Sequence, residues 1–201
     1  HAWTGNVNDG NGVCVYEDAV SNIVEGNTII GAGWHGILIQ DPYTSLYPKK
    51  NIVTGNRIGA HTAYGIAVYI PGTTDTYNQI LNNDVEGITG AANTSLYGSG
   101  IYIVGYGAGG TIVSGNNVRN CCTATTGTTN GPAGISVGGL YSSGAPVLVT
   151  NNVVDGMTKY WGILAATNLG IPVVISGNSV THPTGNTTGE PIRAEASSST
   201  S

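Results

Sequence analysis

The sequence of 201 residues has few charged side chains, a single methionine and no phenylalanine. It contains six Lys and Arg against eleven Asp and Glu, which gives a net charge of −5. Charged residues make up 8% of the chain, about a third of the usual fraction in soluble proteins. So few cations cannot coat nucleic-acid phosphates, and no apolar run is long enough for a membrane span. We therefore expect no nucleic-acid partner and no membrane-spanning segment.

Neutral polar residues and glycine replace the missing charge. The chain has 32 Gly, 20 Asn, 24 Thr and 14 Ser, together with 40% hydrophobic residues. The apolar content suffices for a core, and the Gly and β-branched residues disfavour helices. The cysteines do not have the spacing of a disulfide framework or a metal site. We predict that Cys14, Cys121 and Cys122 are small buried side chains, with a vicinal disulfide between the last two as the alternative.

Two short motifs alternate along the chain, as expected for a repeat protein. The first reads apolar, any, Gly or Asn, Asn, any, apolar, and it occurs as VEGNTI, VTGNRI, ILNNDV, VSGNNV, VTNNVV and ISGNSV. The second reads Gly, apolar, any, apolar, and it occurs as GVCV, GILI, GIAV, GIYI, GISV and GILA. The asparagines that define the first motif are Asn27, Asn56, Asn83, Asn116, Asn152 and Asn178.

Each motif alternates with period two and is only long enough for a short strand. Such strands can pair with the same motif one repeat later, which gives a solenoid of parallel strands. Asparagine suits the bends because its amide bonds to nearby backbone and because Asn tolerates the left-handed conformation; the preceding Gly gives the same bend without a Cβ penalty. We therefore predict an all-β, single-stranded parallel β-helix of about six to seven coils, in which stacked Asn side chains form a ladder.

With these motifs, residues 5–180 resemble a right-handed parallel β-helix of the pectate-lyase-like superfold. We predict a β-helix over residues 1–181, as part of a longer protein, and a polar C-terminal tail over residues 182–201. Within the superfold, the low charge and the Gly, Asn, Thr and Ser content are most similar to the shaft of a phage tailspike or capsule depolymerase. That resemblance implies a homotrimer with a glycan groove on each rod.

Register between coils indicates which charges have a structural role. Residues at the same offset from the ladder Asn stack one strand spacing apart. Arg57 should therefore meet Asp84, and Arg119 should lie between Glu86 and Asp155. We interpret both sets as surface ion pairs that fix register and that contribute little free energy each.

Two acidic residues lie at the same offset on neighbouring coils, five positions after the motif glycine. One coil spacing is close to the ~5 Å carboxyl separation of retaining glycosidases, and a diagonal arrangement reaches the ~6.5–9.5 Å of inverting ones. We therefore predict that Glu17 and Asp41 are catalytic acids. The alternative is a pair of solvated loop acids, or acids held by Lys49 and Lys50.

Aromatic residues cluster just before the second motif and in the loop that follows Asp41. Pyranose rings present an apolar C–H face, and aromatic side chains displayed along a rod can hold such a face; core or turn packing is the alternative. Insertions after Val85 and Val118 emerge from one side of adjacent coils and could wall a groove, because one-sided insertions often mark a binding face. The predicted sugar-binding residues are Trp34, His35, Tyr43, Tyr47, Tyr64 and Tyr69.

These features favour a protein that binds and cleaves an extracellular polysaccharide, as part of a phage virion tail or as a secreted enzyme. A glycoside hydrolase is favoured over a polysaccharide lyase or C5-epimerase, because cations that could neutralise a uronate are sparse. We expect no cofactor and no bound metal, since repeated calcium-binding loops are absent. The alternative from another class is a non-catalytic structural or adhesive β-helix.

Overall fold

The computed structural model describes residues 10–31, 33–41, 47–90, 98–105, 107–123, 133–138, 144–157, 161–168, 172–181 and 190–197. Its strands form three parallel sheets. The first sheet contains β1 (Asn11–Tyr16), β4 (His35–Gln40), β7 (Tyr64–Tyr69), β10 (Ile101–Val104), β13 (Ala133–Gly138), β16 (Trp161–Asn168) and β19 (Ile192–Ser197). The second contains β2 (Ile23–Glu25), β5 (Ile52–Thr54), β8 (Gln79–Leu81), β11 (Ile112–Ser114), β14 (Val147–Thr150) and β17 (Val173–Ser176). The third contains β3 (Thr28–Ile30), β6 (Arg57–Gly59), β9 (Asp84–Glu86), β12 (Asn117–Arg119), β15 (Val153–Asp155) and β18 (Ser179–Val180).

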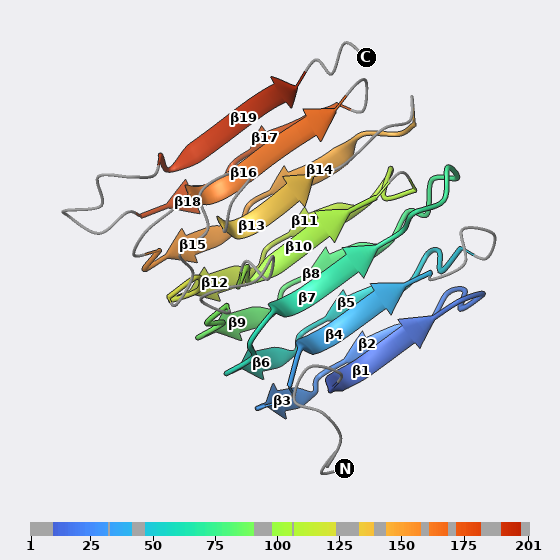
Figure 1. The fold of residues 1–201 in the computed structure, drawn as a ribbon, viewed down its shortest axis with the longest axis horizontal. Helices are drawn as coiled ribbons and strands as arrows, with labels where there is room; N and C mark the ends of the chain where they lie inside the picture. The colour runs from blue at the N-terminus through green and yellow to red at the C-terminus, as the bar shows by residue number, and fades with distance from the viewer. Residues whose placement is uncertain are drawn as a thin grey trace.

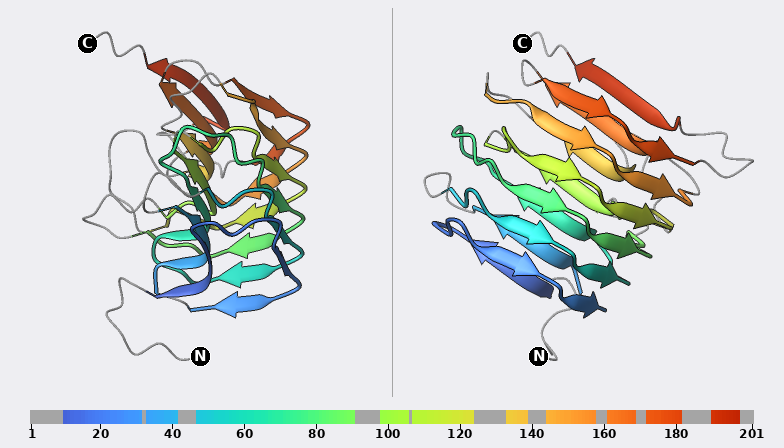
Figure 2. Two further views of the ribbon diagram at one scale, coloured as in Figure 1. Left: turned by 90° about the vertical axis from the view of Figure 1, so that its right-hand side faces the viewer. Right: turned by 180° about the vertical axis from the view of Figure 1, so that it is seen from behind.

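The chain visits the three sheets in turn, and each strand pairs with the strand three positions later. Figure 1 shows the first-sheet strands stacked in chain order from blue β1 to red β19, with the termini at opposite ends. The two views of Figure 2 show the other sheets stacked in the same direction. This arrangement agrees with the predicted parallel β-helix. Among the described residues there is no helix that could cross a membrane.

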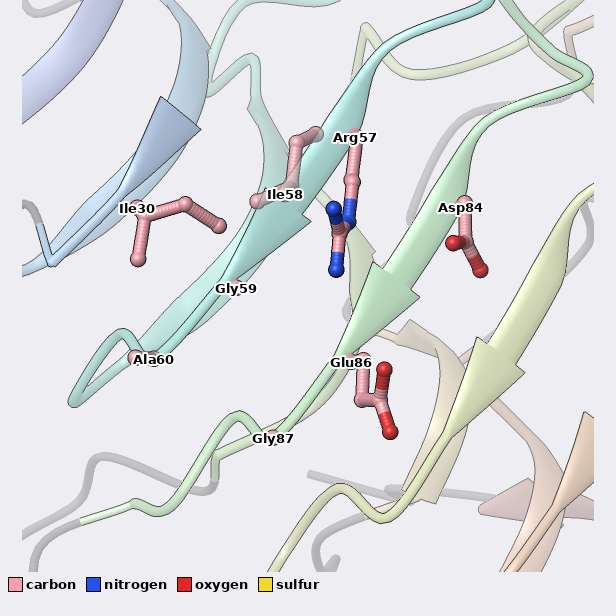
Figure 3. Close-up of a pocket in the computed structure, with 8 residues that line it drawn as sticks. All are labelled: Ile30, Arg57, Ile58, Gly59, Ala60, Asp84, Glu86 and Gly87. Carbon is pink, nitrogen blue, oxygen red and sulfur yellow. The ribbon is translucent and has the colours of Figure 1, made fainter. Parts of the chain in front are cut away.

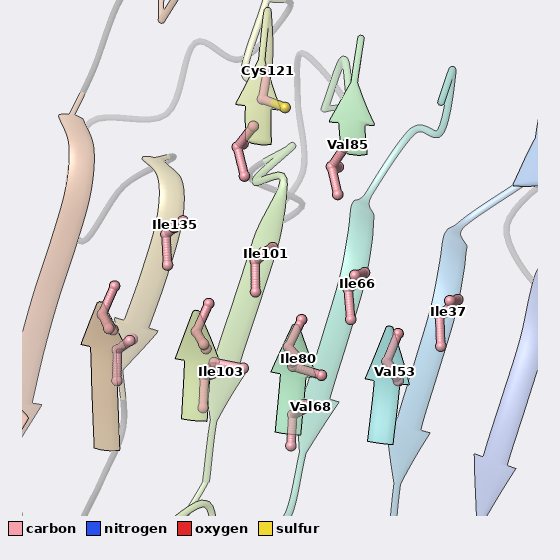
Figure 4. Close-up of a cluster of buried hydrophobic side chains, with 14 of the residues drawn as sticks. Ile37, Val53, Ile66, Val68, Ile80, Val85, Ile101, Ile103, Cys121 and Ile135 are labelled. Atoms are coloured by element: carbon pink, nitrogen blue, oxygen red, sulfur yellow. The ribbon is translucent and has the colours of Figure 1, made fainter. Parts of the chain in front are cut away.

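Stacked aliphatic side chains fill the space between the sheets. A three-residue strand has one inward position, so Val53 of β5 and Ile80 of β8 are fully buried between partly exposed neighbours. The longer strands of the first sheet supply two inward residues each, such as Ile66 and Val68. Figure 4 shows these side chains in rows that cross the strands. The period-two prediction for both motifs is confirmed.

The glycine of the second motif is required by close packing. A β-carbon on Gly65 would collide with Val85 Cγ1 and would lie 2.6 Å from the Gly100 carbonyl oxygen. Equivalent positions meet a β-branched side chain of the third sheet and the next backbone carbonyl in the same way. This glycine column consists of Gly12, Gly36, Gly65, Gly100, Gly134 and Gly162.

The asparagine ladder is confirmed over its whole predicted length. In each step, the backbone N–H and the side-chain Nδ2 of one Asn both donate to Oδ1 of the Asn one coil later, at 2.9–3.0 Å. The left-handed conformation belongs to the preceding residue: φ is +62° at Gly55 and +53° at Asn82. The ladder side chains are Asn27, Asn56, Asn83, Asn116, Asn152 and Asn178.

A second, shorter ladder forms at the entrance to the second sheet. Asn22 donates to Asn51, and Asn51 donates to Asn78, each through its backbone N–H and its Nδ2. These residues lie five positions before a ladder Asn, a regularity that is visible in the sequence but was not predicted as a ladder. The series ends at Thr111, which occupies the same offset in the next coil.

The cysteines differ in their surroundings. Cys121 and Cys122 are buried free thiols, and burial raises the pKa of Cys121 to about 12. The prediction of buried side chains is therefore confirmed for these two residues, and the alternative vicinal disulfide is absent. The prediction is wrong for Cys14, which is exposed because it lies at an outward position of the outermost strand β1.

Strand β19 lies inside the segment that was predicted to be a polar tail. It pairs with β16, and Ile192 and Ala194 take the positions beside Ile163 and Ala165. The stack of strands therefore continues beyond Val180, where the sequence motifs fade. Residues 182–189, between β18 and β19, lie outside the described residues.

Candidate functional site

The outer surface of the first sheet carries a shallow groove with a volume of about 210 Å³. Four of its lining residues were predicted from the sequence as sugar-binding residues, and all of them come from or flank strands β4 and β7. The structure adds β10 through Tyr102. The lining residues, which we call the aromatic groove, are Trp34, His35, Leu38, Gln40, Tyr64, Ala67, Tyr69 and Tyr102.

Strand register explains why these side chains gather. Leu38, Ala67 and Tyr102 occupy the same outward position on three neighbouring strands, and Gln40 pairs with Tyr69 in the next outward row. Because Ala67 is small, the Tyr102 ring can lean diagonally across the row onto Tyr64. Tyr102 stands at the variable position of the second motif, so comparing that position between repeats could have revealed it.

The aromatic rings form a continuous stack. His35 and Tyr64 stack with ring centroids 5.5 Å apart, and Tyr64 and Tyr102 stack at 4.4 Å with an angle of 6° between the planes. Trp34 meets His35 edge to face at 5.6 Å. Tyr64 is thus enclosed between two rings and is 7% exposed, so it supports the groove. A ligand can reach the partly exposed rings of Trp34, Tyr69 and Tyr102.

His35 is an uncharged member of this stack at neutral pH. Burial and, to a smaller extent, the nearby His61 together lower the pKa of His35 to about 4. Its Nδ1 lies 2.6 Å from Asn11 Oδ1, and an amide oxygen only accepts, so the neutral ring donates from Nδ1 and leaves Nε2 as an acceptor. A histidine with so low a pKa is a weak general base at neutral pH.

The predicted catalytic acids lie just beyond the groove. The Glu17 backbone N–H donates to Gln40 O, and the Asp41 N–H donates to Tyr69 O, so both acids follow their strands at the same offset. Glu17 is half-buried with φ of +53°, and Asp41 is fully buried. The same position one strand further is Ile70, which packs in the core. The register agrees with the expected pairing, whereas the burial of Asp41 favours a structural role.

Of the two remaining predicted binding residues, Tyr47 is described by the structure and does not line the groove. Tyr47 packs against the core, where its ring occupies the space beside Gly72. Tyr43 lies in the segment 42–46, outside the described residues, as do most of the two insertions at 91–97 and 124–132. Whether the insertions wall the groove therefore stays a prediction.

A second hollow, of about 240 Å³, lies on the third sheet where Gly59 carries no side chain (Figure 3). The predicted registers are confirmed, because Arg57 pairs with Asp84, and Arg119 lies between Glu86 and Asp155. The ion pairs differ from the expected set. Arg119 binds Asp84 at 2.9 Å and Glu86 at 3.5 Å, and among the described residues no ion pair joins Arg57 to Asp84.

No group of three or more His, Cys, Asp or Glu in the described part of the chain is arranged to hold a metal ion. Comparison of the chain with protein-family models, with curated proteins and with solved structures gives no match. The functional inference therefore depends on the geometry of the aromatic groove and of its neighbouring acids.

Proposed function

We propose that this chain binds an extracellular polysaccharide along the aromatic groove. The observation that carries the proposal is the gathering of partly exposed rings from Trp34, Tyr69 and Tyr102 around one hollow that crosses three strands. Aromatic rings supply rigid apolar contact area for the C–H faces of sugars, and the phenol hydroxyls and the Gln40 amide can bind sugar hydroxyls.

Affinity electrophoresis of the full chain in gels that contain bacterial capsular, O-antigen or plant polysaccharides tests this proposal. Trp34→Ala and Tyr102→Ala should each weaken retardation by the bound glycan at least about tenfold, because each removes one reachable ring. Tyr77→Ala is the matched control, since Tyr77 is 49% exposed and lies outside the groove. Thermal unfolding checks that the variants fold. Absence of binding to every polysaccharide would favour a structural or adhesive shaft.

Cleavage of the bound polysaccharide is the second candidate function, and the shared offset of Glu17 and Asp41 at the end of the groove favours it. In this mechanism one carboxylic acid protonates the leaving oxygen, and the other carboxylate acts as nucleophile or activates water. Glu17→Gln and Asp41→Asn should each abolish the release of reducing ends, and Asp18→Asn, at the exposed neighbouring acid, should not. Equal release by all three variants would contradict the assignment. An unsaturated product would instead indicate a lyase.

We also propose the handedness, the protein class and the oligomeric state of this β-helix. We place the chain among right-handed β-helices of about six to seven coils, as a tailspike-like, extracellular depolymerase fragment that assembles as a homotrimer. The three stacked parallel sheets and the low charge support this class. Sedimentation equilibrium tests the assembly: a mass near 61 kDa, three times the chain mass of 20.4 kDa, supports the trimer, and a mass near 20.4 kDa contradicts it.

A further inference from the structure

We propose that the aromatic groove selects an uncharged glycan and rejects polyanionic ones such as uronates and sulfated chains. This inference rests on the proposed polysaccharide binding and adds the chemical class of the ligand. It is carried by the composition of the lining and by the distribution of charge around it.

The lining contains no charged group at neutral pH. Leu38 and Ala67 are apolar, and the polar atoms belong to the Gln40 amide, to the Trp34 indole N–H, to three phenol hydroxyls and to an imidazole. The pKa of His35, about 4, agrees with this neutral lining. Amides and hydroxyls pair with sugar hydroxyls without transferring charge, so the groove can satisfy an uncharged sugar.

The cations of the described residues lie outside the groove. Arg57 and Arg119 are on the third sheet, and Lys49 and Lys50 precede the second sheet. Arg193 is on β19, where its guanidinium lies 5.1 Å from the Trp161 ring centre. None of these five cations lines the groove.

The charges nearest to the groove along the chain are acidic. Glu17 and Asp18 follow β1, and Asp41 follows Gln40 directly. An anionic sugar would therefore lose its hydration shell beside a neutral wall with no cation to replace the water. The net charge of −5 adds repulsion at long range. Both effects disfavour a polyanion and leave a neutral glycan unaffected.

The path of the groove suits a polymer. Its residues come from β4, β7 and β10, so a bound chain would run across the strands and along the stack of coils. Two strand spacings of ~4.8 Å give a length of ~10 Å, which a short oligosaccharide can occupy. Neutral hydroxyls repeat along such a chain and can meet the groove's amide and phenol groups in turn.

An array of neutral and anionic polysaccharides, including polyuronates beside their carboxyl-reduced neutral forms, tests the selectivity of the full chain. We expect binding to neutral members only, lost in Trp34→Ala, and changed less than about twofold between about 0.05 M and about 0.5 M NaCl because no charge pairs contribute. A polyuronate that binds as tightly as its reduced form would overturn this inference while leaving polysaccharide binding intact. Absence of binding to every member would overturn both.

Placing a positive charge in the groove gives a second test, in which binding of polyanions should increase rather than decrease. Gln40→Lys should raise retention of the polyuronates at least about tenfold at low salt, because the new ammonium supplies the missing cation. Gln40→Met, which has similar volume and no charge, should not raise it. If both variants retained the polyuronates equally, the lack of a cation would not be the reason for rejection.

Discussion

The asparagine ladder and the aromatic groove are both built from side chains that stack from coil to coil, but they differ in length and in contacts. The ladder continues through six asparagines with the same pair of hydrogen bonds at every step. The ring stack of the groove covers β4, β7 and β10, and on β13 the Tyr102 position becomes Ser136. Uniform repetition therefore marks what holds the coils together, and the local departure from it forms the groove to which we assign polysaccharide binding.

The glycine column is a second uniform repeat, and breaking it should have the largest effect. Gly65→Ala places a methyl group against Val85 and 2.6 Å from the Gly100 carbonyl oxygen, and neither can move without disturbing a neighbouring coil. We expect a loss of about 4 kcal/mol or more in the free energy of unfolding, or failure to fold. Urea denaturation followed by circular dichroism measures it.

Gly138→Ala is the matched control in the same sheet. A β-carbon at Gly138 meets nothing closer than the Ala166 carbonyl oxygen at 3.7 Å, which is ordinary contact. We expect a change within about 1 kcal/mol. Equal losses at Gly65 and Gly138 would contradict the role of close packing in the glycine column.

The stability cost of removing a ladder asparagine should depend on whether that asparagine is buried or exposed. Asn83→Ala removes the acceptor for Asn56 and the donors to Asn116 and Val53, all of them buried. We expect a loss of about 2–4 kcal/mol, because buried polar groups are left without partners. Asn27→Ala, at the exposed end of the ladder, should cost about 1 kcal/mol when measured in the same way. Equal costs would show that water replaces the ladder bonds at both places.

The sequence predicts the repeating elements well, because they impose one residue type at one offset. Asn56 and Gly65 have equivalents in every other copy of their motifs. Aligning the copies therefore predicts which residues stack on them in the neighbouring coils. Tyr102 was missed because it is the single tyrosine in a row that also contains Leu38, Ala67 and Ser136. The repeat pattern alone does not predict such a residue, but comparing the variable position between copies of the motif would have shown that it differs.

Charge partners were also harder to predict than register. Pairing placed Arg57 beside Asp84 as expected, yet Asp84 binds Arg119 from the neighbouring strand. Long side chains reach diagonal positions on a sheet, so register fixes backbone neighbours without fixing ion pairs. The burial of Asp41 was missed for a related reason. The offset from the motif glycine gives the position of a residue along its strand, but it does not determine whether the side chain is buried.

The ring stack contains a titrating group that the ladder lacks. The folded-state pKa of His35 is about 4, below the ordinary 6.5, so the unfolded chain takes up the proton first as the pH falls. The stability contribution is complete above pH 6.5 and is lost toward pH 4, by about 2 kcal/mol between pH 6.5 and pH 5. Urea denaturation of wild type and His35→Gln across this range measures the difference. Identical pH dependence of the two proteins would contradict the lowered pKa.

Removing the surface ion pairs should have the smallest effect on the free energy of unfolding. Comparing Arg119 with Arg57 shows whether two arginines that each pair in register with an acidic residue of a neighbouring strand contribute equally to stability. Arg119 donates to Asp84 at 2.9 and 3.1 Å and lies 3.5 Å from Glu86, but all three side chains are more than a third exposed. Arg119→Ala should therefore cost less than about 1 kcal/mol, and less still at high salt. Arg57→Ala should be near neutral, since its backbone pairing with Asp84 brings no ion pair. Urea denaturation at low and high salt compares them, and a larger loss for Arg57 than for Arg119 would mean that backbone register, rather than side-chain contact, determines the charge energies on this sheet.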